Sequence, residues 1–267
     1  MASGFLKRIV LAIALLYPVM ATADEANPYG LLDPATISIG TMADSKPNTF
    51  VQPDGTYTGF DIDLFMNLAQ RMGYPKNKVT ITSQDFSALM PSVANQRFDV
   101  AIAAIGATEA RKKNVDFSDG YLLFYLSVLS PDASIKDAGD LKGKRLGVVQ
   151  GALTDLYATK NFTDADIVRF PDNNTAIAAL NNGTIDAHFM DHDPASDYSK
   201  RYSNLKIRID IPQLDTPAGF VVRKGNVHLQ EAINKALHEA IDDGTYKAIF
   251  AKWFPDAPLP DRFQPRK

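Results

Sequence analysis

The sequence predicts an α/β protein made of two successive α/β units. In residues 37–121, short β-branched and apolar runs alternate with amphipathic segments. A second alternation of the same kind begins at Leu146. Two extended stretches, Leu122 to Leu129 and Ala218 to Arg223, follow the first and the second unit. Because strands separated by helices pair in parallel through right-handed crossovers, each unit predicts an open sheet covered by helices.

The first unit opens with a strand that leads into the loop Met42 to Phe50. Open α/β sheets bind ligands at the carboxyl ends of their strands, so this loop is a candidate binding segment. Asp54-Gly55 indicates a hairpin turn. The apolar residues that follow recur at helical spacing up to Gly73. The expected elements are strands at Ile37–Thr41, Val79–Ile81 and Val100–Ile105, and helices at Phe60–Arg71 and Asp85–Asn95.

The second unit repeats the alternation, and two helices close the chain. Gly183 is expected as the C-cap of one helix, and Gly244 ends the long helix before the last one. The apolar spacing of Tyr246, Phe250 and Trp253 indicates that last helix. The other expected elements are strands at Leu146–Gln150, Ile167–Phe170, Ile185–Met190 and Leu205–Ile211, and helices after Gly151, at Asn174–Leu180 and at Val227–Asp242.

The segment VAIAAIGATEARKKNVDFSDGY, from Val100 to Tyr121, predicts an anion-binding turn. Gly106 breaks the strand, and Thr108 has the position of an N-cap. A helix N-terminus leaves backbone N–H groups without internal partners. Arg111 adds a guanidinium in the first turn, which can hold a carboxylate through two parallel hydrogen bonds. Spacing alone equally allows a surface arginine after an ordinary turn.

The first residues predict a secretory signal peptide. Lys7 and Arg8 form a short basic region, and Ile9 to Val19 is apolar. Ala21-Thr22-Ala23 supplies the small residues of a cleavage site, so we expect residues 1–23 to be removed after Ala23. A transmembrane anchor is the alternative, but it needs roughly 20 apolar residues. The chain has no cysteine, which excludes a lipidated cysteine, a disulfide and thiolate chemistry.

The charge of the mature chain argues against nucleic-acid and membrane-surface binding. Without Lys7 and Arg8, 26 basic residues remain against 31 acidic residues, a net charge of −5. This mild acidity favours solubility.

Several motifs together resemble one family. The segment GATEARKKNVDFSDGY is similar to the ITxxRxxxxDFSxPY segment of bacterial periplasmic solute-binding proteins for polar amino acids, solute-binding protein family 3. That family includes the glutamine-, histidine- and lysine/arginine/ornithine-binding proteins. The other matching pieces, in order, are Gly59-Phe-Asp-Ile-Asp-Leu64, Asp85-Phe-Ser87, Asp140-Leu-Lys-Gly-Lys-Arg-Leu-Gly147, Asn182-Gly183, Ile185-Asp-Ala187, Asp191, Asp243-Gly-Thr-Tyr246 and Lys252-Trp-Phe254.

The resemblance implies a two-lobed periplasmic binding protein (type II) fold. Two doubly wound sheets are then joined by two hinge strands that let the lobes close on a ligand. It places residues 24–121 and 218–267 in a discontinuous first lobe and residues 122–217 in the second.

The resemblance also implies ligand-binding roles. Arg111 aligns with the arginine that holds the ligand's α-carboxylate, helped by backbone N–H groups around Gly106 and the loop Gly151-Ala152-Leu153. Asp191 aligns with the aspartate that accepts from the α-ammonium, although it could instead cap the next helix. Phe86 matches an aromatic residue that packs over the ligand, although it could simply belong to the core.

Seven positions depart from the family pattern: Met42, Ser45, Asn48, Ala104, Gly106, Ala152 and Leu153. Met42 replaces an acid of the first loop, and Asp44, two residues later, can serve in its place. The first loop lacks the aromatic pair that is usual in the family. The hydroxyl groups that often contact the ligand's carboxylate in the family are also absent. We therefore expect a ligand with an α-amino-acid head and a tail that differs from glutamine or histidine, with room for a larger conjugate.

The run HFMDHD brings two histidines close to two acids and raises the question of a metal site. His188 and His192 would share a face only if this run were helical, whereas its pattern predicts a strand followed by a polar loop. We therefore expect neither metal nor cofactor, and place His192 beside Asp191 in the cleft.

The leading hypothesis is a monomeric periplasmic binding protein that captures an amino-acid-like ligand and delivers it to a membrane ABC permease. An enzyme on the same scaffold, resembling the dehydratases that act on prephenate or arogenate, is the first alternative. No cleft carboxylate beyond Asp44 and Asp191 and no Ser-His or Cys-His set is available for it. The second alternative is a stand-alone ligand sensor that acts with a separate membrane receptor.

Overall fold

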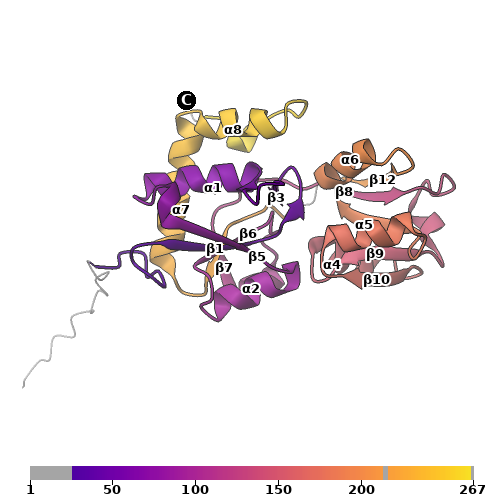
Figure 1. The fold of residues 1–267 in the computed structure, drawn as a ribbon, viewed down its shortest axis with the longest axis horizontal. Coiled ribbons are helices and arrows are strands. Elements are labelled where there is room, and N and C mark those ends of the chain that lie inside the picture. The colour runs from indigo at the N-terminus through magenta and orange to yellow at the C-terminus, as the bar shows by residue number, and fades with distance from the viewer. Residues whose placement is uncertain (1–25, 213–215, 266–267) are drawn as a thin grey trace, which may run out of the picture.

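A computed structural model describes residues 26–212 and 216–265. It shows two α/β lobes side by side, each built around a five-stranded sheet (Figure 1). The predicted α/β fold class is confirmed. The expected signal peptide lies outside the described residues. No helix within residues 26–212 and 216–265 is long and apolar enough to cross a bilayer.

The first sheet has the strand order β5-β1-β6-β13-β7. β1 pairs in parallel with β5 and with β6, whereas β13 is antiparallel to β6 and to β7. β13 follows the second lobe in the chain, so the polypeptide returns to complete the first sheet. The strands are β1 (Ile37–Thr41), β5 (Val79–Ser83), β6 (Val100–Ile102), β7 (Val115–Phe117) and β13 (Val221–Arg223).

Helices cover both faces of the first sheet. α1, α7 and α8 pack together on one face, and α2 covers the other (Figure 1). The chain thus returns to the first lobe with its two C-terminal helices as well as β13. The helices are α1 (Phe60–Arg71), α2 (Phe86–Ala94), α3 (Glu109–Lys112), α7 (Val227–Asp242) and α8 (Thr245–Trp253), with short 3-10 turns η1 (Lys76–Lys78) and η3 (Asp261–Phe263).

The loop expected over Met42 to Phe50 contains secondary structure of its own. A small antiparallel sheet forms from β2 (Asp44–Ser45), β3 (Thr49–Val51) and β4 (Tyr57–Thr58). Gly55 makes the hairpin turn between β3 and β4 with a φ of 83°. This short sheet fixes the first loop beside the carboxyl end of β1.

The second sheet has the strand order β10-β9-β11-β8-β12. β9 pairs in parallel with β10 and β11, and β8 is antiparallel to β11 and β12. The elements are β8 (Leu126–Ser130), η2 (Ala138–Leu141), β9 (Arg145–Val149), α4 (Leu153–Asn161), β10 (Asp166–Phe170), α5 (Asn173–Asn181), β11 (Ala187–Asp191), α6 (His192–Arg201) and β12 (Lys206–Ile211).

Helix α6 corrects the sequence prediction, which placed a polar loop after β11. The helix begins directly at His192, and Pro194 lies in its first turn, where a proline is tolerated. Only Pro194, Ala195 and Tyr198 are buried. The rest of the helix is polar, so its sequence shows little of the apolar periodicity that identifies a helix.

Strand β6 is shorter than the predicted strand Val100–Ile105. It ends at Ile102, and Ala104 adopts a φ of 46°, a conformation that non-glycine residues rarely take. The buried carboxylate of Asp61 accepts a hydrogen bond from the backbone N–H of Ala104 at 2.6 Å. That bond supports the turn that leads into the Gly106 segment.

The described parts of the two crossings between the lobes lie next to each other. Ala218 makes isolated bridges with both Gly106 and Leu122. Tyr121 stacks on Phe220 with ring centroids 4.1 Å apart. The two extended segments therefore start from one packed position at the edge of the first lobe. Residues 213–215, in the second crossing, are outside the described chain.

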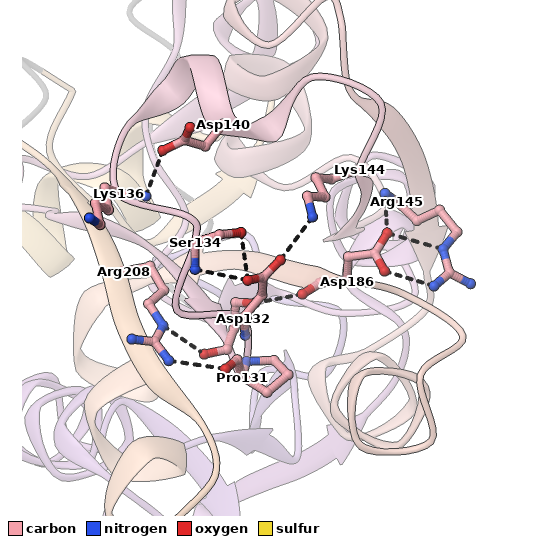
Figure 2. A network of polar contacts seen from close by, with 10 residues as sticks. Pro131, Asp132, Ser134, Lys136, Asp140, Lys144, Arg145, Asp186 and Arg208 are labelled. Carbon is pink, nitrogen blue, oxygen red and sulfur yellow. Dashed lines mark hydrogen bonds and ion pairs between the residues drawn. The ribbon is translucent and has the colours of Figure 1, made fainter.

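A polar network fastens the connection between β8 and β9 to the second lobe (Figure 2). Lys144 pairs with Asp132 at 2.8 Å, and Arg145 pairs with Asp186 at 2.7 Å. Arg208 donates to the carbonyl groups that end β8. Arg145 begins β9, at the opposite end of that strand from Gly151.

Gly59 determines how the first loop meets helix α1. Its φ is 132°, and a Cβ there would overlap the carbonyl oxygen of Asn48. The carbonyl groups of Pro47 and Asn48 accept from the N–H groups of Phe60 and Asp61, each at 2.9 Å. The loop thereby satisfies backbone donors that the helix leaves free.

We expect Gly59→Ala to lower the free energy of unfolding by roughly 3 kcal/mol or more, because strain and overlap act together. Gly55→Ala is the matched control, since Gly55 also has a positive φ but has nothing within 4 Å of an added Cβ. Its cost should be about 1 kcal/mol. Chemical denaturation measures both, and equal costs would contradict the packing described here.

Candidate functional site

Arg111 lies buried between the two lobes. The hydroxyl of Thr108 accepts from the backbone N–H of Arg111 at 3.3 Å, as an N-cap does. The guanidinium donates from Nη1 to the carbonyl of Gly106 and from Nη2 to the carbonyl of Gly151, both at 2.8 Å. Gly151 belongs to the second lobe, so one side chain bonds to both halves of the molecule.

Burial sets the electrostatic character of Arg111. The residue is only 8% exposed, and desolvation lowers the pKa of its guanidinium to about 10, although Asp191 acts in the opposite direction. Its hydrogen-bonding partners are neutral carbonyl groups. A buried cation of this kind gains most from an anionic partner.

Asp191 is the last residue of β11 and the residue before α6. It occupies the N-cap position, but its side chain makes no capping hydrogen bond. Within residues 26–212 and 216–265, no hydrogen bond is made by its carboxylate. Desolvation raises its pKa to about 7, with repulsion from Asp193 adding to the effect and attraction to Arg111 opposing it.

Arg111 and Asp191 come from opposite lobes and lie close enough to interact electrostatically. Their charges interact in both directions, since each shifts the pKa of the other toward its ionised form. No ion pair closer than 4.0 Å joins them among the described residues. A cation and an acid held apart in this way can bind the two ends of a zwitterion.

Phe86 packs in the core, one of the two roles that its sequence allowed, and also contacts Arg111. The Arg111 guanidinium carbon lies 5.4 Å from the centre of the Phe86 ring, a cation–π distance. The ring is also buried in an apolar cluster with Met42 and with Val149 of the second lobe. Phe86 thus holds the guanidinium in place from one side, and its contact with a ligand stays a prediction.

Leu153 and Gly106 meet where the lobes touch. A Cβ built on Gly106 would lie 3.4 Å from a methyl carbon of Leu153. Ala104, which belongs to the same turn, is buried, and Ala152 packs on the cluster around Phe86. A side chain at position 106 would therefore come into contact with Leu153 of the second lobe.

The first-loop residues have partners of their own. Asp44 accepts from the backbone N–H of Asn174 in the second lobe at 2.7 Å. Ser45 and Asn48 are buried beside it. The role of Asp44 as a substitute for the missing acid at Met42 stays a prediction, because its carboxylate already binds the protein.

The two histidines point to different partners. His188 is buried, with Nδ1 3.0 Å from the carbonyl of Gly147 and Nε2 3.2 Å from Oδ1 of Asn173. His192 has Nδ1 2.8 Å from the Ser127 hydroxyl and 3.0 Å from Asp210. Across the described ranges, no three His, Cys, Asp or Glu side chains are grouped as metal ligands.

Sequence reasoning missed two features of the site. The Gly151 loop was expected to contribute N–H donors, but in this structure its carbonyl accepts from Arg111. Asp193 was not singled out as a charge that acts on Asp191. The HFMDHD run contained the signal for Asp193, but the helix that begins at His192 was not expected.

A groove of about 860 Å³ is lined by residues of both lobes. Its lining includes His192 and Asp193, which are one and two residues after Asp191 in the chain. It also includes Leu122 and Leu123 of the first crossing and the end of α8. Tyr125 and Trp253 are among the aromatic residues that line it.

Comparison with known proteins agrees with this geometry. The profile of bacterial extracellular solute-binding proteins, family 3, matches residues 37–256. The L-cystine-binding protein TcyJ of Escherichia coli is 30% identical over 92% of this chain and 93% of its own length. The lysine/arginine/ornithine-binding periplasmic protein of the same organism is 30% identical, with 93% and 97% covered.

Solved structures show the same architecture. An ancestral arginine-binding protein bound to glutamine superposes with a TM-score of 0.79 at 36% identity, covering 83% of this chain and 99% of that one. The two-lobed fold of the present chain is therefore that of a solute-binding protein. The chain belongs to the bacterial extracellular solute-binding proteins of family 3.

We expect Arg111→Gln to raise the pKa of the Asp191 carboxyl further above about 7, because the substitution removes the cation that favours its ionised form. Carbon-detected NMR titration of the aspartate carboxyl groups measures this without any ligand. Asp186 is the control, since its pKa is lowered by Arg145 and should not move. If the pKa of Asp191 is the same in Arg111→Gln as in the wild type, the two side chains do not interact as described.

Proposed function

We propose that this protein is the periplasmic binding component of an ABC importer for a polar amino acid or a close derivative. The observation that supports the proposal is the electrostatic interaction between Arg111 and Asp191, one from each lobe, with no ion pair between them among the described residues. The guanidinium would bind the α-carboxylate and Asp191 the α-ammonium. Closing the lobes about the two crossings would bury the ligand.

The relatives support this role. They are named as binding proteins for cystine and for lysine, arginine and ornithine, which are all α-amino acids. None of those names describes an enzyme, so we propose binding without catalysis. We place the mature protein in the periplasm after cleavage behind Ala23, as a monomer that delivers its ligand to a membrane permease.

The tail of the ligand would extend into the groove beside Asp193. Phe86 packs against Arg111 and Leu153 against Gly106, whereas His192 and Asp193, the two residues after Asp191, line the groove. Ser45, where the family has an aromatic residue, does not fill that side of the first loop. We therefore propose a ligand with an α-amino-acid head and a tail that is longer than that of glutamine or histidine.

Calorimetry with a panel of amino acids and their conjugates tests the proposal. For the ligand that binds, Arg111→Ala should raise Kd by roughly 100-fold or more, because two charge-assisted hydrogen bonds to the carboxylate are lost. Arg145→Ala is the matched control, since Arg145 pairs with Asp186 away from the cleft. If no member of the panel binds, or both variants weaken binding equally, the proposal is wrong.

Affinity should also fall as the pH is lowered from 8 to 5. Asp191 must be ionised to pair with an ammonium group, and its pKa without that partner is about 7. Each pH unit below that value should cost up to about tenfold in Kd. In Asp191→Asn, binding should be weak and nearly independent of pH in this range. A wild-type affinity that is constant or rises on acidification would exclude Asp191 as the ammonium partner.

A further inference from the structure

Asp44 links the two lobes at a position separate from Arg111. It lies in β2 of the first lobe, and its carboxylate accepts from the backbone N–H of Asn174, the second residue of α5 in the second lobe. We propose that Asp44 is a positioning residue that holds the lobes together, and so sets ligand affinity without touching the ligand. This rests on the proposed function only in that closing the lobes is what retains a ligand.

The chemistry of the contact favours a strong interaction. Asp44 is 9% exposed, and the Asn174 N–H lies 2.7 Å from its Oδ2. The N-terminus of a nine-residue helix attracts a negative charge, and a hydrogen bond to a carboxylate is stronger than one between neutral groups. Asp172, the N-cap of α5, opposes it electrostatically, but its own carboxylate accepts from the Thr175 N–H.

A side chain from α6 completes the contact. The Tyr198 hydroxyl lies 3.0 Å from Oδ1 of Asn174, to which it donates, and 3.4 Å from the backbone carbonyl of Asp44. Next to it, Lys46 of the first lobe pairs with Asp197 of α6 at 3.1 Å. We call Asp44, Asn174 and Tyr198 the clasp. Two helices of the second lobe thus meet one two-residue strand of the first.

The clasp contributes little to the first lobe itself. Oδ1 of Asp44 is buried without a hydrogen-bonding partner among the described residues, and Oδ2 binds the other lobe. When the lobes separate, this carboxylate regains water and Asn174 loses its acceptor. The hydrogen bond therefore exists in only one arrangement of the lobes, which is what a contact needs to shift the equilibrium between them.

The clasp is also independent of the zwitterion site. Arg111 reaches the second lobe at Gly151, before α4, whereas Asp44 reaches it at the start of α5. A ligand held between Arg111 and Asp191 gains from closure at both places. Weakening the clasp should therefore weaken every ligand of the site by a similar factor.

The absence of cysteine allows a direct test on the mature protein. Ala94→Cys at the end of α2 and Lys160→Cys in α4 place a fluorophore pair on exposed positions, one on each lobe. Single-molecule energy transfer then reports the fraction of molecules with lobes together, with no ligand added. We expect Asp44→Ala to lower the ratio of closed to open molecules roughly tenfold.

Asp54→Ala is the matched control. Asp54 is an exposed acid of the neighbouring turn, where it accepts from the Thr56 N–H, and its loss should leave the distribution unchanged. Far-UV circular dichroism of each variant checks that the lobes remain folded. Equal distributions in the wild-type and Asp44→Ala proteins would overturn the proposal, whether or not any amino acid binds.

A double-mutant cycle separates the clasp from a general loss of charge. Tyr198→Phe removes the hydroxyl that orients Asn174 and should also lower the closed fraction. Combined with Asp44→Ala its effect should be less than additive, because both changes act on Asn174, whose N–H binds Asp44 and whose Oδ1 accepts from Tyr198. Asp44→Asn retains an oxygen acceptor and should fall between Asp44→Ala and wild type. Fully additive effects of Asp44→Ala and Tyr198→Phe would contradict a shared clasp.

Discussion

The burial of the Arg111 guanidinium between two lobes is the constraint on which the site depends. It is held by carbonyl groups from both lobes, at Gly106 and Gly151, and by the ring of Phe86. Carbonyl groups satisfy its hydrogen bonds but do not neutralise its charge. The charge of Arg111 lowers the pKa of the Asp191 carboxyl, but no ion pair joins the two side chains among the described residues. The proposed binding of a molecule with both charges rests on this separated pair of opposite charges.

Burial also raises the pKa values of the neighbouring acids Asp61 and Asp44. Asp61 lies beneath the site, where it holds the Ala104 turn, and desolvation raises its pKa to about 7. The pKa of Asp44 is raised to about 6 by burial, with the Asn174 N–H acting in the opposite direction. The three acids therefore differ in their contacts. Asp61 binds the Ala104 turn and Asp44 binds the second lobe, whereas Asp191 is the proposed partner of an ammonium group.

Much of the fold could be predicted from the sequence, because its local signals are strong. The bounds of β1, α1 and α7 follow apolar periodicity and glycine positions, and Thr108 marks the helix that presents Arg111. Contacts between distant segments could not be predicted in this way. The partner of Asp44 lies 130 residues away, and the polar helix α6 has too small a buried face to be recognised. The positive φ of Ala104 depends on Asp61, 43 residues earlier.

A crystal structure of the native protein with the ligand that co-purifies with it tests the zwitterion site most directly. We predict a carboxylate of the ligand on the Arg111 guanidinium and its ammonium group within hydrogen-bonding distance of Asp191, with the tail directed to the groove beside Asp193. A ligand that touches only one of these two side chains, or that lies outside the space between the lobes, would contradict this prediction.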